Sequence, residues 1–186
     1  GLTLTPVGPT DVFRRFAGCN LWSGREEDQA KSVFRFCDTE FVGTDGSFGG
    51  KFGTASGLAE RIASLWPKGQ DRRYAILTVC ESLQQVDSRL IGVLHAYGFE
   101  VAVATNGSLE APEGIDALSQ SEGLRVGGLR RLRKGNELKL VYPQKDLLPD
   151  AIADCEFEHS LIQPINGQDA AANPRSTIAF CQANAR

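Results

Sequence analysis

The sequence predicts an α/β fold with a parallel sheet, and two features indicate it. Apolar residues repeat at helical spacing over residues 58–66 and 83–97, as on one face of an amphipathic helix. Short apolar runs at 73–79, 99–105 and 138–142 are typical of buried strands. Helices that alternate with such strands favour a parallel sheet with right-handed crossovers. We expect a single domain over residues 1–186.

Local signals justify the elements of the first half in order. Residues 12–16 alternate imperfectly and predict a strand that enters a loop. The polar stretch 23–32 predicts an exposed loop or a short helix, and the five glycines from 43 to 53 predict a loop. Pro67 ends the first helix, and Gly98 is a suitable residue to end the second.

The second half continues the pattern. We expect a helix over 145–154, a strand over 157–162 and an alanine-rich helix within 169–186, which Pro174 either starts or interrupts. His95 falls within the second helix pattern, where a structural role is expected. Ligands of parallel sheets bind at the carboxyl ends of the strands. We therefore expect ligand contacts in the segments that follow the strands, at 17–20, 78–82, 105–108 and 163–166.

Composition excludes several classes of protein. The chain has 186 residues, 41% of them apolar and 23% charged, which is typical of a soluble globular domain. A net charge of −3 argues against a nucleic-acid partner bound through its phosphates. We find no apolar run of the roughly 18 residues that a membrane helix needs, and no signal peptide. Five cysteines, an odd number, favour a reducing, cytoplasmic setting over a disulfide scaffold.

Two cysteines stand in the most distinctive segments. Cys19 follows a glycine at a predicted strand end, and Cys37 lies between Phe36 and Asp38. Thiolates gathered on one loop can hold an iron–sulfur cluster. Spacing alone leaves two interpretations open, a pair of cluster ligands or two unrelated thiols. A structural zinc site is disfavoured because no C-x2-C pair occurs, and neither a GxGxxG motif nor a P-loop is present.

Several motifs in a fixed order resemble one family. They are RFAGCNLW at 15–22, FCDTEFVGTDG at 36–46, TNGS at 105–108, KGNELK at 134–139 and QP at 163–164. With them the chain resembles 7-carboxy-7-deazaguanine synthases, radical S-adenosylmethionine enzymes of 7-deazapurine (queuosine) biosynthesis. The insertion at 21–33 places it with the subgroup whose cluster motif is expanded to C-x14-C-x2-C.

The resemblance implies a fold and a reaction. The fold is a shortened, modified radical-enzyme (β/α) partial barrel. The reaction is the ring contraction of 6-carboxy-5,6,7,8-tetrahydropterin to 7-carboxy-7-deazaguanine with loss of ammonia. It uses a [4Fe-4S] cluster, S-adenosylmethionine and Mg²⁺, and the cofactor carries the radical chemistry. The implied partners are the small pterin substrate, an electron donor such as flavodoxin and a second copy in a homodimer, with no nucleic acid and no membrane.

The resemblance also assigns residues. Cys19 and Cys37 would bind the cluster, and the Thr39 hydroxyl would bind Mg²⁺, a hard cation. Arg15 and Thr78 would bind the substrate, with the guanidinium on its carboxylate. S-adenosylmethionine would contact Phe36, Asp38, Cys80, Ser121, Gln163, Pro164, Ile165 and Asn166. An N-terminal substrate loop and a C-terminal closing segment are not recognised, so we expect both to be incomplete.

The sequence departs from the family pattern in its key motifs. Phe34 stands where the third cluster cysteine is expected, and VCES at 79–82 replaces GGEP, so both glycines are lost. Ala104 replaces an acid, and an SPK element is missing near Ser121. A local reading-frame shift and a freely diverged loop both remain open for that element. We therefore expect little or no turnover. The alternatives are a non-catalytic α/β module that binds a pterin or nucleotide, or a degraded homologue without activity.

Overall fold

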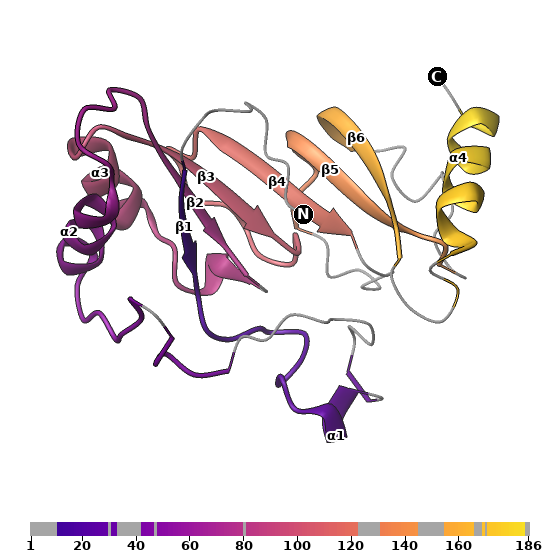
Figure 1. Cartoon of the computed structure of the whole chain (residues 1–186), viewed down its shortest axis with the longest axis horizontal. Coiled ribbons are helices and arrows are strands. Elements are labelled where there is room, and N and C mark those ends of the chain that lie inside the picture. Colours follow the sequence, from indigo (N-terminus) through magenta and orange to yellow (C-terminus); the bar gives the residue numbers. More distant parts are fainter. Residues whose placement is uncertain are drawn as a thin grey trace.

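The computed structural model describes residues 11–29, 31–32, 42–46, 48–79, 81–122, 131–144, 155–165, 169 and 171–184. Its centre is one six-stranded sheet in the order β1-β2-β3-β4-β5-β6, with every neighbouring pair parallel. The strands are β1 (Val12–Arg15), β2 (Arg73–Thr78), β3 (Phe99–Thr105), β4 (Ala117–Glu122), β5 (Lys134–Tyr142) and β6 (Glu156–Pro164). The expected α/β class and parallel sheet are confirmed, and the open sheet is consistent with a partial radical-enzyme barrel (Figure 1).

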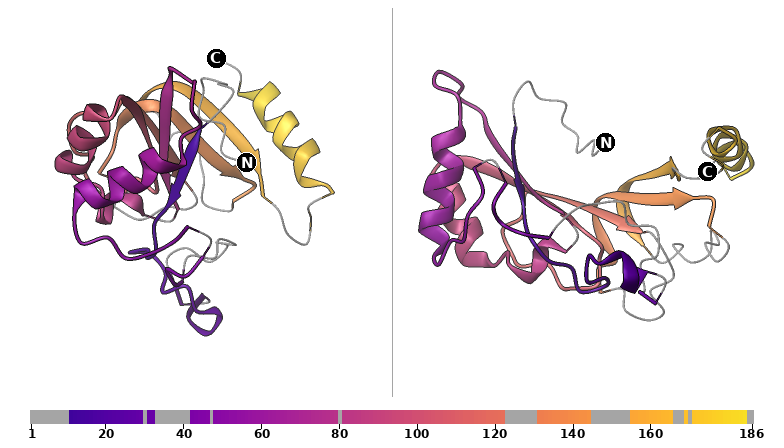
Figure 2. Two further views of the ribbon diagram at one scale, coloured as in Figure 1. Left: turned by 60° about the vertical axis from the view of Figure 1, so that its left-hand side comes forward. Right: turned by 60° about the horizontal axis from the view of Figure 1, so that its bottom comes forward.

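Helices flank the two ends of the sheet. They are α1 (Glu26–Gln29), α2 (Ala55–Leu65), the 3-10 helix η1 (Ser82–Gln84), α3 (Ser88–Ala96) and α4 (Asn173–Ala183). Figure 1 and Figure 2 show α2 and α3 side by side near β1–β3, while α4 lies near β6 at the far end of the sheet. No described helix is long and apolar enough to cross a membrane.

The two packed helices begin at side-chain caps. The Thr54 hydroxyl accepts a hydrogen bond from the Gly57 amide at 3.1 Å and starts α2. The Asp87 carboxylate accepts from the Leu90 amide at 2.8 Å and starts α3. Pro67 follows the end of α2, as the sequence predicts.

One predicted helix is shorter than its apolar pattern. The sequence predicts a helix over 83–97, but α3 begins only at Ser88, so the earlier start is wrong. Leu83 and Val86 are buried as expected, yet they belong to the turn region of η1. The reason is local, because the cap at Asp87 fixes an extended backbone immediately before α3.

The sequence also missed one strand. β4 has the sequence ALSQSE, without a β-branched or aromatic residue, and it is a strand because β3 and β5 pair with it on both sides. β5 and β6 contain the expected strands and extend beyond them. The C-terminal helix is confirmed, with Pro174 in its first turn. The helix expected over 145–154 lies outside the described residues.

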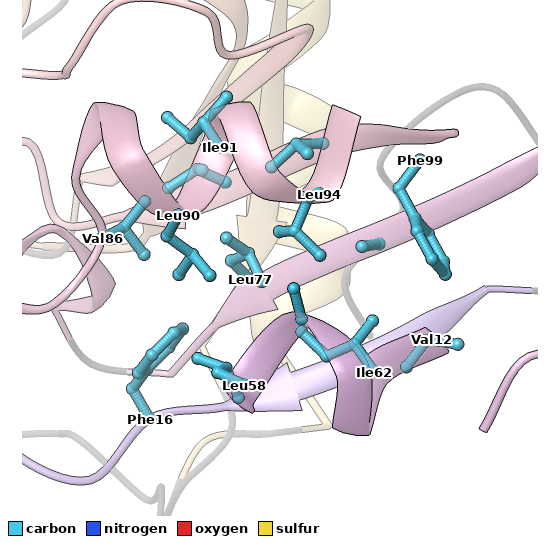
Figure 3. Close-up of a cluster of buried hydrophobic side chains, with 14 of the residues drawn as sticks. Val12, Phe16, Leu58, Ile62, Leu77, Val86, Leu90, Ile91, Leu94 and Phe99 are labelled. Carbon is cyan, nitrogen blue, oxygen red and sulfur yellow. The ribbon is translucent and has the colours of Figure 1, made fainter. Parts of the chain in front are cut away.

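The main core lies between the sheet and the pair α2 and α3. Alternate strand residues such as Leu77 and Val103 are fully buried against Ile62 and Leu94 from the helices (Figure 3). The Trp66 ring meets the Phe99 ring edge to face with centroids 5.6 Å apart. This face of the sheet, which we call the outer face, is therefore occupied by the helices.

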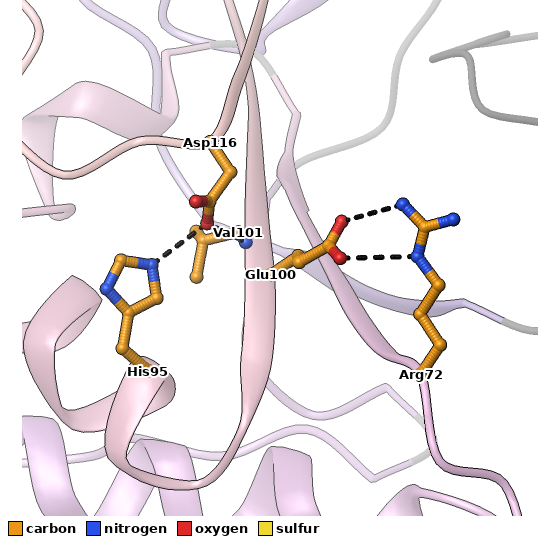
Figure 4. Close-up of polar contacts among 5 residues, drawn as sticks. All are labelled: Arg72, His95, Glu100, Val101 and Asp116. Carbon is orange, nitrogen blue, oxygen red and sulfur yellow. Dashed lines mark hydrogen bonds and ion pairs between the residues drawn. The ribbon is translucent and has the colours of Figure 1, made fainter.

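Polar contacts join the N-terminal ends of β2, β3 and β4. His95 Nε2 lies 2.9 Å from a carboxylate oxygen of Asp116, and the Val101 amide donates to the same oxygen at 2.7 Å (Figure 4). The Arg72 guanidinium forms two hydrogen bonds with Glu100, at 3.2 and 3.0 Å. His95 thus joins α3 to the start of β4, the structural role that the sequence predicts.

The other face of the sheet, which we call the inner face, is apolar near the N-terminal ends of the strands and polar near their carboxyl ends. Its N-terminal half is apolar, with a cluster of Tyr74, Ile76 and Ala102. Strand periodicity carries Thr78 and then polar residues of β4 and β5 onto the same face toward the carboxyl ends. The apolar half supports the sheet, and the polar half carries titratable and hydroxyl side chains.

Candidate functional site at the carboxyl ends of the strands

Three of the four segments predicted to border a ligand meet at one edge of the sheet. The side-chain NH₂ group of Asn20, after β1, donates to the Ser108 hydroxyl at 2.8 Å, and the side-chain NH₂ group of Asn106 donates to Asn20 Oδ1 at 3.1 Å. Both partners follow β3. The Gln85 amide, after β2, donates to the Ala17 carbonyl at 2.7 Å. These bonds tie together loops that are up to 88 positions apart in sequence.

A buried carboxylate organises the same edge. Glu81 is completely buried, and its oxygens accept hydrogen bonds from the Thr105 hydroxyl, the Leu83 amide and the Asn106 amide. Burial raises the pKa of Glu81 above its usual value, and these hydrogen bonds oppose that rise only in part. The one residue of VCES that retains the family motif therefore holds the loop after β2 against the end of β3.

The two predicted substrate residues are neighbours across β1 and β2. The strand register pairs Arg15 with Thr78, so both side chains lie on the inner face at the carboxyl ends of their strands. Thr78 is only 4% exposed, whereas Arg15 is exposed. A guanidinium beside a hydroxyl offers several donors to a carboxylate or a heterocycle.

Two further predicted residues fall on the same face, although they come from distant parts of the sequence. Ser121 on β4 pairs with Lys139 on β5, and Gln163 on β6 pairs with Val141 on β5. Ser121 is half-buried and Gln163 is exposed. The inner face therefore carries four of the residues that the resemblance assigns to ligands, spread from β1 to β6.

Sequence reasoning missed the polar pair of β5. Glu137 and Lys139 are 2% and 5% exposed, and their charged groups lie 3.3 Å apart. The KGNELK motif contains both residues, but as a motif it indicates only the resemblance to the family. The available signal was the alternation of two charges with Leu138 and Leu140, which places the charges on the face away from the helices.

The residues at the end of β6 that the resemblance assigns to S-adenosylmethionine lie beside α4. The Ile165 amide donates to the Tyr142 carbonyl at 2.7 Å, and the Asn173 amide group donates to the Ile165 carbonyl at 2.8 Å. Pro164 is the last residue of β6. The ring of Tyr142 also packs against Phe180 of α4, with centroids 4.6 Å apart. These contacts fix the end of β6 between β5 and α4.

Cys19 lies where the sequence predicts it, directly after β1. Gly18 precedes it with φ +103°, a conformation that favours glycine. The Cys19 sulfur accepts a hydrogen bond from the Leu21 amide at 3.4 Å. The other predicted ligands and cofactor contacts lie outside the described residues, namely Phe36, Cys37, Asp38, Thr39, Cys80 and Asn166, as does Phe34, which stands where the third cluster cysteine is expected. Within the described part, no three His, Cys, Asp or Glu residues gather as a metal site.

The backbone after β2 keeps a conformation suited to the lost glycine motif. Val79 has φ +86°, the left-handed region that side chains with a branched Cβ rarely adopt. In the family pattern this position belongs to the glycine-rich GGEP segment. A valine side chain now stands where close backbone approach to a ligand is expected. In the pattern that the resemblance implies, a valine at 79 does not fit S-adenosylmethionine in the family manner, and Phe34 would leave the cluster short of one thiolate.

Comparison with known proteins agrees with the motifs. The chain is 48% identical over 175 residues to the 7-carboxy-7-deazaguanine synthase of Bradyrhizobium diazoefficiens, covering 94% of this chain and 82% of that protein. It is 47% identical to the synthase of Bordetella pertussis over the same shares of the two chains. It is 40% identical to the synthase of Nitratidesulfovibrio vulgaris over 97% of this chain and 85% of that protein. No family profile matches the chain.

Identity of this level over most of both sequences, on a parallel α/β sheet, leaves one assignment. The chain belongs to the 7-carboxy-7-deazaguanine synthase family.

Proposed function

We propose that this chain is a 7-carboxy-7-deazaguanine synthase-like protein that binds 6-carboxy-5,6,7,8-tetrahydropterin on the inner face of its sheet. The observation that carries the proposal is the pairing of Arg15 with Thr78 at the carboxyl ends of β1 and β2, in a chain of this family. The Arg15 guanidinium would bind the substrate carboxylate. The Thr78 hydroxyl, buried beside it, would bind a polar edge of the pterin.

The donor set does not support the family's full chemistry. A [4Fe-4S] cluster needs three cysteines beside S-adenosylmethionine, and Phe34 supplies no thiolate. The valine at 79 crowds the position of a ligand-facing glycine. We therefore assign pterin binding to this chain and expect little or no turnover. Binding of Mg²⁺ by Thr39, pairing into a homodimer and reduction by a flavodoxin-type donor belong to the same proposal, as properties of the family.

Ligand binding tests the proposal independently of catalysis. The full chain is titrated calorimetrically under anaerobic conditions with pterin-6-carboxylate, with pterin and with S-adenosylmethionine. We expect pterin-6-carboxylate to bind more tightly than pterin. Arg15→Met should weaken pterin-6-carboxylate about tenfold or more, because a charged hydrogen bond to the carboxylate is lost, and should leave pterin unchanged. Arg89→Met, an exposed arginine on α3, is the matched control.

The titrations distinguish three interpretations of the chain. Binding of the pterin without S-adenosylmethionine supports a module that has kept its substrate site and lost its cofactor site. Binding of both ligands supports a complete synthase site. Binding of neither contradicts the proposal and leaves a degraded homologue.

A further inference from the structure

The inner face carries a buried ammonium group to which the proposed function gives no role. Lys139 on β5 is 5% exposed. Its Nζ lies 3.3 Å from a carboxylate oxygen of Glu137 but makes no hydrogen bond to any residue that the structure describes. An ammonium has three donors, and buried donors are almost always satisfied. Lys139 is one of several buried side chains among the described residues that depart from this rule, and its charge makes the missing hydrogen bonds costly.

The neighbours of Lys139 differ in exposure on its two sides. Strand register places Ser121 on one flank and Leu161 on the other, and Val141 follows on the same face. Ser121 and Val141 are half-buried, and Leu161 is 40% exposed. On the other side, Glu137 is buried and holds the ammonium in place. The amino group thus lies between the buried Glu137 carboxylate and neighbours that are only half-buried or exposed.

A second polar group stands beside this pair without a partner. Ser119 is fully buried, opposite Glu137 in the register, and its hydroxyl makes no hydrogen bond within the described parts of the chain. Ser119 and Ser121 lie on the same face of β4. An ammonium with a hydroxyl on its flank is a donor set suited to a carboxylate.

We propose that Lys139, with Ser119 and Ser121 beside it, forms a second carboxylate-binding subsite, an inference that rests on the proposed function. It is separate from Arg15, because β1 and β5 lie four strand spacings apart, roughly 19 Å along the sheet. Both small molecules of the family's reaction carry a carboxylate, the pterin on its ring and S-adenosylmethionine on its methionyl part. The chemistry that Lys139 would recognise is the carboxylate itself, and the test below distinguishes its sources.

Paired ligands and paired variants test the subsite. Dissociation constants are measured for pterin-6-carboxylate against pterin, and for S-adenosylmethionine against 5′-methylthioadenosine, which lacks the carboxylate. Lys139→Met keeps the aliphatic stem and removes the charge, and Lys134→Met, an exposed lysine on the same strand, is the control. We expect Lys139→Met to weaken one carboxylated ligand about tenfold or more and its carboxylate-free counterpart less than twofold. The ligand that is weakened identifies the source of the carboxylate.

A direct measurement on the unmodified chain tests the subsite without depending on the folding of a variant. With ¹³C-labelled lysine, the Lys139 side-chain signal should shift on addition of the same carboxylated ligand, or of formate alone. A shift with formate but no binding of any pterin or S-adenosylmethionine would uphold the subsite and contradict the proposed function. Equal affinities in the unmodified chain and Lys139→Met, or a Lys139 signal that no carboxylate moves, would overturn the subsite.

Discussion

The hydroxyl of Thr105 lies 2.8 Å from both carboxylate oxygens of Glu81 and joins the end of β3 to the loop after β2. Two backbone amides, of Leu83 and Asn106, donate to the same carboxylate. Glu81 is thus the acceptor on which three donors at the candidate site depend.

Removal of this acceptor should destabilise the protein. Glu81→Ala leaves a buried hydroxyl and two amides without their partner, which costs about 2–4 kcal/mol of unfolding free energy. Urea denaturation measures the loss. Glu60→Ala, an exposed glutamate within α2, should change stability by less than about 0.5 kcal/mol. Equal effects of the two substitutions would contradict the role of Glu81.

The same carboxylate predicts a pH dependence. Because burial raises the pKa of Glu81 in the folded state, the folded protein binds this proton at a pH where the unfolded chain has released it. The stability that Glu81 contributes is greatest below the usual glutamate pKa and falls as pH rises through the raised pKa. Denaturation of the unmodified chain and Glu81→Ala from pH 4 upward should show their difference shrinking. A difference in unfolding free energy that grows with pH would contradict a raised pKa of Glu81 in the folded protein.

Val79 should be a site where glycine stabilises. Its φ of +86° costs about 1–3 kcal/mol for a non-glycine residue, more than the roughly 0.5–1 kcal/mol of chain entropy that glycine loses on folding. Val79→Gly should therefore raise the unfolding free energy by about 1 kcal/mol. Val79→Ala removes the branch but keeps a Cβ, so it should gain less. Thermal denaturation of the three proteins gives the order, and a loss of stability in Val79→Gly would show that no strain is stored there.

Gly107 should tolerate no side chain. It has φ +78°, and a Cβ there would overlap the fully buried side chain of Gln120. Gly107→Ala should cost about 2–4 kcal/mol, from backbone strain and overpacking together. Gly69 has a similar φ of +83° with no atom within 4 Å of its Cβ position, so Gly69→Ala isolates the strain at about 1 kcal/mol. If the two substitutions cost the same, Gln120 does not restrict the site.

Cluster assembly should depend on position 34. Anaerobic reconstitution with iron and sulfide should leave the unmodified chain with far less than a full [4Fe-4S] cluster, since Phe34 provides no thiolate. Phe34→Cys should raise the iron content and the absorbance of the cluster, and Phe34→Ser should not. A stable four-iron cluster on the unmodified chain would contradict the prediction.

Local sequence determined the elements whose signals lie within a few residues. Pro67 and the cap at Thr54 bound α2, and the apolar runs at 73–78 and 99–105 form β2 and β3, the strands that the sequence predicts. The motif around Cys19 and the TNGS segment also identified the family and the edge of the sheet where Asn20 and Ser108 meet. Such features are encoded over short distances, so one sequence suffices to find them.

Only the tertiary structure decided the rest. β4 is a strand because two neighbours pair with it, and Lys139 stands beside Ser121 because the register of β4 and β5 sets them opposite each other. The burial of Glu81 likewise requires the end of β3 to meet the loop after β2. Pairing, register and desolvation join residues far apart in the chain, and no local pattern encodes which strands will pair and which of their residues will stand opposite each other.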